Sequence, residues 1–146
     1  MMKKILIIQS RFNALITDKL TQDFQSIMHE NNIQSDVLMV PGALEIPQTM
    51  SRILKSNHSY EGMVGIGCVI KGETYHFEIV ANESARGIMN LSLESSIPII
   101  NGILCCYNQE QAIQRAQSHG SKDSTESKGR EFGEAMIQMI QNISVL

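Results

Sequence analysis

Long hydrophobic runs are absent from this chain of 146 residues, and none approaches the roughly 20 apolar residues that a helix needs to cross a bilayer. Near the amino terminus, two lysines precede the apolar run ILII, but this run is far too short for a secretion signal and no small-residue cleavage site follows it. We therefore expect a cytoplasmic protein with no membrane partner.

Cysteine is also scarce, and the three that occur, Cys68, Cys105 and Cys106, have neither the pattern of a disulfide framework nor the spacing of metal ligands. They fit a reducing compartment, as small apolar residues in or beside strands. The sequence therefore predicts no metal site.

Charge of one sign is not concentrated anywhere in the chain. Twelve Lys and Arg stand against fifteen Asp and Glu, for a net charge of −3, so no basic face for nucleic acid is predicted. The content of 42% hydrophobic and 18% charged residues is that of an ordinary globular protein, and residues 1–146 are expected to form a single domain.

Short apolar segments alternate with amphipathic ones along the chain. The expected strands are residues 3–9, 36–40, 63–70 and 98–105. An amphipathic helix follows the first strand, with Thr17 and Asp18 as candidates for its cap and first turn. Its apolar residues recur at three- and four-residue spacing and are Leu20, Phe24, Ile27 and Met28. The other expected helices are residues 45–55, 81–94, 109–117 and 128–143, the last with an apolar stripe of Phe132, Met136, Met139, Ile140 and Ile143.

This alternation predicts an α/β fold, a three-layer α/β/α sandwich with a four-stranded parallel sheet of the flavodoxin-like type. The polar segment 118–127 is interpreted as an exposed loop between two helices. Sheets of this type place their binding sites at the carboxyl ends of the strands, so the turns that follow the four strands are expected to converge.

Two of these turns carry a residue that can be interpreted in two ways. Phe12 follows a charged residue after the first strand, where its ring either stacks on a planar heterocycle or folds back onto the sheet edge. Gly42 lets the chain turn closely after the second strand. Glu45 then lies near a helix start, where its carboxylate either complements the helix dipole or accepts ligand hydroxyls.

The turn KGETYH, which follows the third strand, is the best candidate for an anion site. Lys71 adds a positive charge, Gly72 frees backbone N–H groups, and Thr74 adds a hydroxyl before a helix, a combination that suits phosphate. Glu73 opposes an anion unless its side chain points away. His76 closes the turn and is the predicted general acid or base.

Further positive charge for this site is available from two residues nearer the carboxyl terminus. Arg115 and Lys128 are the candidates, although both are also explained as solvated helix residues. Glu131, three residues after Lys128, is a candidate ion-pair partner for one of them.

Together, these motifs resemble the lumazine synthases, which catalyse the penultimate step of riboflavin synthesis. The segments that match in order and spacing are RFN, VPGALEIP, GCVIKGETYHFEIVANESARGI, IPIINGIL, EQAIQRA and KG, and they cover nearly the whole chain. Each fragment alone is weak, but the set is specific.

The resemblance implies two small-molecule substrates and no cofactor or metal. A ribitylaminopyrimidinedione would condense with 3,4-dihydroxy-2-butanone 4-phosphate to give 6,7-dimethyl-8-ribityllumazine, phosphate and water. By resemblance, His76 is the proton donor. The pyrimidine and ribityl contacts are Phe12, Ala43, Leu44, Glu45, Cys68, Val69, Ile70 and Asn101, and the butanone phosphate contacts are Glu73, Thr74 and Arg115.

Two positions depart from the common pattern of the resembled family. Asn101 stands where many members carry an aromatic residue from the neighbouring subunit, and Glu73 stands where many carry a small one. The resemblance also implies rings of five subunits with sites between neighbours. Because the chain begins almost at its first strand and has a long loop before Lys128, we expect a free pentamer or a pair of pentamers rather than a sixty-subunit shell.

Three other functions are compatible with a fold of this type. A signalling receiver domain needs an acceptor Asp at the end of its third strand, where this chain has Val69 and Ile70. A non-catalytic flavin-binding protein would need a Ser/Thr-rich turn after the first strand, which this chain lacks. A riboflavin synthase of the archaeal type, which dismutates the lumazine instead of making it, is the closer alternative.

Overall fold

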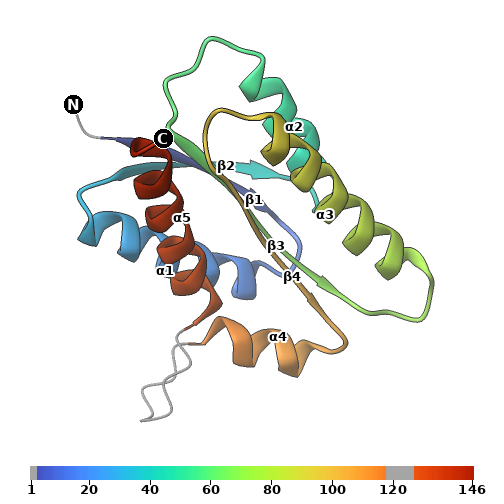
Figure 1. The fold of residues 1–146 in the computed structure, drawn as a ribbon. Coiled ribbons are helices and arrows are strands. Elements are labelled where there is room, and N and C mark those ends of the chain that lie inside the picture. Colours follow the sequence, from blue (N-terminus) through green and yellow to red (C-terminus); the bar gives the residue numbers. More distant parts are fainter. Residues whose placement is uncertain (1–2, 118–126) are drawn as a thin grey trace.

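The computed structural model describes residues 3–117 and 127–146. Its four strands are β1 (Lys4–Ser10), β2 (Gln34–Val40), β3 (Gly62–Ile70) and β4 (Ile99–Cys106). All neighbouring strands run parallel, in the order β2-β1-β3-β4, as Figure 1 shows. This order belongs to the doubly wound flavodoxin-like arrangement, in which the chain moves from the centre of the sheet to each edge in turn.

Helices cover both faces of this sheet and complete three layers (Figure 1). One face packs against α1 (Ala14–Glu30), α4 (Gln109–Ala116) and α5 (Lys128–Ser144), and the other packs against α2 (Glu45–Leu54) and α3 (His76–Glu94). The predicted α/β/α sandwich is therefore confirmed. No helix within the described residues is both long and apolar enough to span a membrane.

The two sides of β1 show why the chain needs both helical layers. Ile5 and Ile7 are fully buried on the side of α1, while Leu6 and Ile8 are buried on the side of α2. Alternate residues of a strand point to opposite faces, so a strand that is apolar throughout has to be covered twice.

The start of α1 differs from the prediction. The helix begins at Ala14, and its N-cap is Asn13, whose φ of 58° lies in the left-handed region that asparagine tolerates better than most residues. Thr17 and Asp18 were therefore the wrong cap candidates. Both side chains instead bind the side-chain amide of Gln9, at 3.2 and 2.7 Å, and so attach α1 to the end of β1.

The start of α3 also differs from the prediction, since the helix begins at His76 and not near residue 81. Its first turns carry no buried apolar stripe, because Ile79 is 45% exposed and the buried face starts at Val80. A pattern based on hydrophobic spacing misses such a turn. As a result, His76 lies in the first turn of a helix rather than in the preceding loop.

Small residues allow α5 to pack closely on α1. A Cβ added at Gly129 would lie 2.5 Å from the carbonyl oxygen of Leu20, and one added at Gly133 would lie 2.7 Å from Cβ of Ile27. Buried Ser127 caps α5, accepting from the backbone N–H of Arg130 and donating to Asp23 at 2.5 Å.

The predictions for this part of the chain are only partly correct. Ser127 is buried, contrary to the predicted exposed loop, and the rest of that loop lies outside the described residues. Of the predicted stripe, Met136 and Ile140 are buried, but Met139 and Ile143 are 41% and 37% exposed. The buried face of α5 instead consists of Gly129, Gly133, Met136 and Ile140.

Candidate functional site

The carboxyl ends of β1, β2 and β3 meet the first turns of α2 and α3 around a pocket of about 320 Å³. This volume lies at the small end of the range for ligand pockets. The lining residues are Ser10, Phe12, Asn13, Pro41, Gly42, Ala43, Leu44, Glu45, Cys68, Val69, Ile70, His76 and Val80. Convergence was predicted for the turns after all four strands and is observed for these three, whereas no residue of β4 or of the turn after it lines the pocket.

Phe12 and Glu45 both lie beside Gly42, where a side chain at that position would project. A Cβ added at Gly42 would lie 3.7 Å from Cδ2 of the phenyl ring and 3.3 Å from Oε2 of the carboxylate. The ring is 70% exposed and lines the pocket, so it is not folded back onto the sheet edge. Glu45 occupies the first turn of α2, where a carboxylate complements the helix dipole and still reaches the pocket.

The end of β3 forms another wall of the pocket, through Cys68, Val69 and Ile70. The side chain of Asn13 donates to the carbonyl oxygen of Cys68 at 2.9 Å and fixes this wall to the end of β1. Burial raises the pKa of the Cys68 thiol to about 12, so the group stays neutral at physiological pH.

All three cysteines are free, and their surroundings differ. Cys68 and Cys106 are buried as expected. Cys105 lies in a strand, as predicted, but is exposed, because alternate residues of the edge strand β4 point away from the core formed with α4 and α5. Within the described residues, no group of three or more His, Cys, Asp or Glu side chains could hold a metal ion.

His76 is the first residue of α3 and lines the pocket. Its helix has no side-chain cap at Tyr75, which leaves backbone N–H groups of the first turn available to an anion. Glu73 and Thr74 are exposed in the preceding turn but do not line the pocket. The turn does not require Gly72, since an added Cβ would meet nothing within 4 Å.

Lys71 and Lys128, two of the candidate cations for the anion site, lie outside the pocket. The amine of Lys71 lies 5.8 Å from the ring centroid of Tyr107, which also lies 6.4 Å from the ring of Phe77. The amine of Lys128 pairs with Glu131 at 2.7 Å, as the sequence indicated.

Two of the predicted ligand contacts do not reach this pocket within one chain. Arg115 lies in the last turn of α4, in the other helical layer. Asn101 is the third residue of β4, where its side-chain oxygen accepts from the N–H of Ile103 at 2.9 Å.

Four pocket residues, Ser10, Asn13, Pro41 and Val80, were not singled out from the sequence as site candidates. Pro41 belongs to the VPGALEIP turn, so its position after the second strand was the available signal. Ser10 and Asn13 belong to the turn that was identified, so their position after the first strand was the available signal. Val80 had none, because the first turns of α3 were not recognised as helical.

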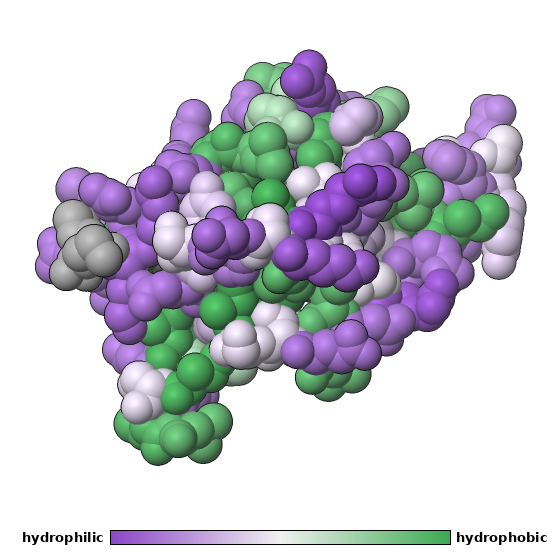
Figure 2. All heavy atoms as spheres, turned by 90° about the horizontal axis from the view of Figure 1, so that it is seen from above, coloured by the Kyte–Doolittle hydropathy of each residue, from purple (hydrophilic) through white to green (hydrophobic). Residues whose placement is uncertain are grey.

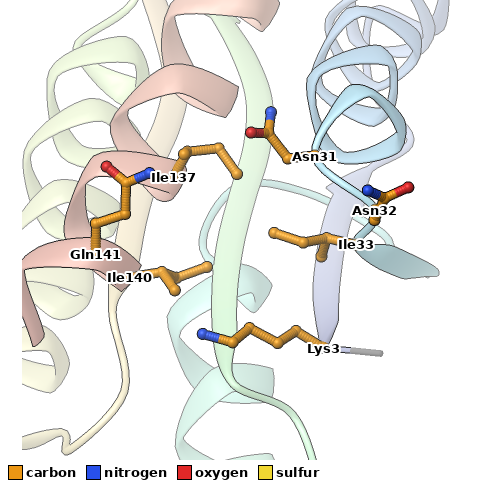
Figure 3. A pocket seen from close by; sticks show the side chains of 7 residues that line it. All are labelled: Lys3, Asn31, Asn32, Ile33, Ile137, Ile140 and Gln141. Carbon is orange, nitrogen blue, oxygen red and sulfur yellow. The ribbon is translucent and has the colours of Figure 1, made fainter. Parts of the chain in front are cut away.

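A larger hollow of about 650 Å³ lies at the opposite edge of the sheet, where Ile33 and Ile140 point towards each other (Figure 3). Its lining is made of amides and isoleucines, with Lys3 as the titratable side chain among the lining residues. Parallel α/β sheets bind their ligands at the other edge, at the carboxyl ends of the strands. We therefore assign the site to the smaller pocket.

A doubly wound sheet whose pocket combines an exposed aromatic ring, a carboxylate and a histidine defines an α/β protein that binds and acts on a small polar molecule. The particular family follows from sequence comparison. The family description "6,7-dimethyl-8-ribityllumazine synthase" matches residues 2–144, and the chain belongs to this family.

Curated relatives with this name are similar over nearly their whole length. The protein of Bartonella tribocorum is 43% identical over 136 residues, which are 93% of this chain and 87% of the relative. That of Afipia carboxidovorans is 41% identical, covering 94% and 84%, and that of Erythrobacter litoralis is 41% identical, covering 96% and 95%.

Proposed function

We propose that the protein catalyses the condensation of 5-amino-6-(D-ribitylamino)pyrimidine-2,4-dione with 3,4-dihydroxy-2-butanone 4-phosphate, which gives 6,7-dimethyl-8-ribityllumazine and phosphate. Family membership supports the reaction. The observation that carries the assignment is the pocket itself, which brings Phe12, Glu45 and His76 together from three different strand ends. Of the eight pyrimidine and ribityl contacts implied by the resemblance, seven line this pocket, and Asn101 is the exception.

In this proposal the pyrimidine ring stacks on Phe12, whose exposed face is free to accept a planar heterocycle. The backbone at the end of β3 forms hydrogen bonds with the edge of the pyrimidine ring. Glu45 and the backbone of Ala43 and Leu44 bind the hydroxyls of the ribityl chain, since an ionised carboxylate is a strong acceptor.

The phosphate binds at the amino terminus of α3, near Glu73 and Thr74. Uncapped N–H groups of a first helical turn and the positive end of the helix dipole favour an anion there. Arg115 adds its charge from a neighbouring subunit, because within one chain it lies in the other helical layer.

The chemistry begins with attack of the 5-amino group on the ketone carbon, which forms an imine and releases water. Loss of a proton from C3 of the butanone chain then expels phosphate from C4 and leaves an enol, which tautomerises to a ketone at C3. The ribityl-bearing nitrogen attacks this new carbonyl carbon. Ring closure releases a second water. His76 moves protons in the early steps, while much of the acceleration comes from holding the two reactants together.

We further propose that the single domain formed by residues 1–146 assembles into pentamers, free or in pairs, in the cytoplasm. Edge strand β2 exposes Val37, Leu38 and Met39, and α3 exposes Met89 and Leu93. Apolar patches also lie among hydrophilic side chains on the face drawn in Figure 2. Exposed apolar side chains of this kind favour association with further copies. Light scattering should give five or ten times the 16.3 kDa of one chain, and a mass near sixty copies would contradict the proposal.

The direct test is to incubate the purified protein with both substrates and to follow lumazine fluorescence and phosphate release together. Equal amounts of the two products are expected. Fluorescence that is lost when the protein is given lumazine alone would indicate a riboflavin synthase instead. Binding of lumazine, without condensation of the two substrates and without dismutation of lumazine, would indicate a storage protein.

A further inference from the structure

One polar atom at the base of the pocket has no partner. Of the buried side-chain nitrogen and oxygen atoms in the described residues, Ser10 Oγ alone makes no hydrogen bond. Ser10 is the last residue of β1, is 1% exposed and lines the pocket. Because buried hydroxyls are nearly always hydrogen-bonded, a lone exception at a binding pocket indicates a missing partner.

The neighbours of Ser10 Oγ explain why the chain itself supplies none. The hydroxyl lies over Gly67 of β3, where an added Cβ would come within 3.1 Å of it. That same position is 3.5 Å from Ile46 Cδ1 and 3.5 Å from Ile103 Cγ1, which are both apolar. The absence of a side chain at Gly67 keeps the space beside the hydroxyl open.

The preceding residue of β1 provides an internal comparison. Gln9 points to the other face of the sheet and is equally buried, yet its side chain is fully engaged. Its amide nitrogen donates to Thr17 and Asp18, and its oxygen accepts from Thr21 at 2.7 Å. At the end of β1, the side chain that faces α1 therefore has its hydrogen-bond partners, whereas the hydroxyl that faces the pocket has none.

We propose that the Ser10 hydroxyl is a binding group for the polyhydroxylated chain of the substrate, an inference that rests on the proposed function. Glu45 and Ser10 line the same pocket, and Ile46, which borders the open space beside Ser10, directly follows Glu45, so a chain bound by that carboxylate lies in the pocket that the Ser10 hydroxyl faces. A ligand hydroxyl can both donate to and accept from a serine hydroxyl. The pyrimidine ring, by contrast, is placed on the exposed face of Phe12.

The test compares Ser10→Ala with the wild type in binding of the ribitylaminopyrimidinedione, measured by calorimetry, and in thermal unfolding of the free protein. We expect the Kd of Ser10→Ala to rise about fivefold, which is the size of one neutral hydrogen bond. The KM for butanone phosphate stays unchanged. The melting temperature of the free variant stays the same or rises, because no protein hydrogen bond is lost.

Thr21→Val is the matched control. Thr21 belongs to α1, and its buried hydroxyl donates to Gln9 near the end of β1, on the other face of the sheet. This substitution should lower the melting temperature and leave the Kd unchanged. A melting temperature of Ser10→Ala that falls as far as that of Thr21→Val would overturn the proposal, because the hydroxyl would then have a structural partner.

A second ligand identifies the group that Ser10 contacts. For an analogue with an unsubstituted alkyl chain in place of ribityl, wild type and Ser10→Ala should bind equally. A fivefold difference that persists with this analogue would assign Ser10 to the pyrimidine and refute the contact with the chain. If the wild type binds neither ligand, the proposed function fails, whereas equal binding of the ribityl compound by both proteins refutes only the role of Ser10.

Discussion

The side-chain amide of Asn13 donates to the carbonyl oxygen of Cys68 at 2.9 Å and so joins two strand ends that are 55 residues apart in the sequence. Both residues line the pocket. Asn13 makes this contact from a left-handed backbone conformation, as the N-cap of α1. One residue thus sets the start of a helix and the position of a pocket wall.

Substitutions of Asn13 separate these two roles. Asn13→Gly removes the hydrogen bond but keeps a residue suited to a positive φ, so the free energy of unfolding should fall by about 1 kcal/mol. Asn13→Ala also places a strained alanine at this position and should cost about 1 kcal/mol more. Chemical denaturation of both variants measures the difference. Equal stability of the two would mean that the left-handed conformation carries no strain.

His76→Ala should lower kcat about 100-fold, towards the low end for loss of a general acid or base. The remaining activity reflects the positioning of two reactants that condense readily. His29→Ala is the control, since His29 is exposed at the far end of α1, and its kcat should match the wild type. Unchanged turnover of His76→Ala would remove this residue from the mechanism.

The sequence predicted those parts of the site that follow directly from strand ends. Phe12, Glu45 and His76 come from turns after β1, β2 and β3, and parallel strands bring such turns to one edge of the sheet. Ser10 could not be recognised in this way. A serine in a turn is ordinary, and the absence of a hydrogen-bond partner becomes visible only when the other strands surround it.

The wrong start of α3 and the partly wrong stripe of α5 have a common physical cause. Hydrophobic spacing detects buried apolar side chains, but the first turns of α3 are exposed, and part of the buried face of α5 is formed by Gly129 and Gly133, which such a pattern does not count. Arg115 and Asn101 show a different limit of prediction from the sequence. The resemblance implied ligand contacts for both, but neither lines the pocket of this chain, because Arg115 lies in the other helical layer and Asn101 lies within β4.

Gly129→Ala should destabilise the contact between α1 and α5 by about 1–3 kcal/mol, the usual range for overpacking. Its new Cβ would lie 2.5 Å from a backbone oxygen of Leu20, which cannot turn aside as a flexible side chain can. Gly72→Ala is the matched control, because nothing lies within 4 Å of its added Cβ. Its stability should equal or slightly exceed that of the wild type. Thermal unfolding of both variants decides the comparison.

A small cluster at the amino end of the sheet should make stability depend on pH. Tyr60 donates to Oδ2 of Asp36 at 2.8 Å, and the amine of Lys4 lies 3.2 Å from the same oxygen. The hydrogen bond from Tyr60, followed by Lys4, lowers the pKa of the Asp36 carboxyl from its ordinary 3.8. Burial, followed by the bond to Asp36, raises the pKa of Tyr60 above 10.0.

These two pKa shifts set the direction in which the stability of the fold changes with pH. Asp36 stabilises the fold above pH 3.8, and this contribution is lost as the pH falls through its lower folded pKa. Tyr60 contributes below pH 10.0, and its contribution is lost as the pH rises through its higher folded pKa. Tyr60→Phe should therefore lower the melting temperature by a few degrees between about pH 5 and 9, since a partly exposed pair contributes at most about 1 kcal/mol. The difference from wild type should shrink below pH 3.8 and above pH 10.0. A constant difference across this range would mean that the loss of the hydroxyl acts independently of the charge on Asp36.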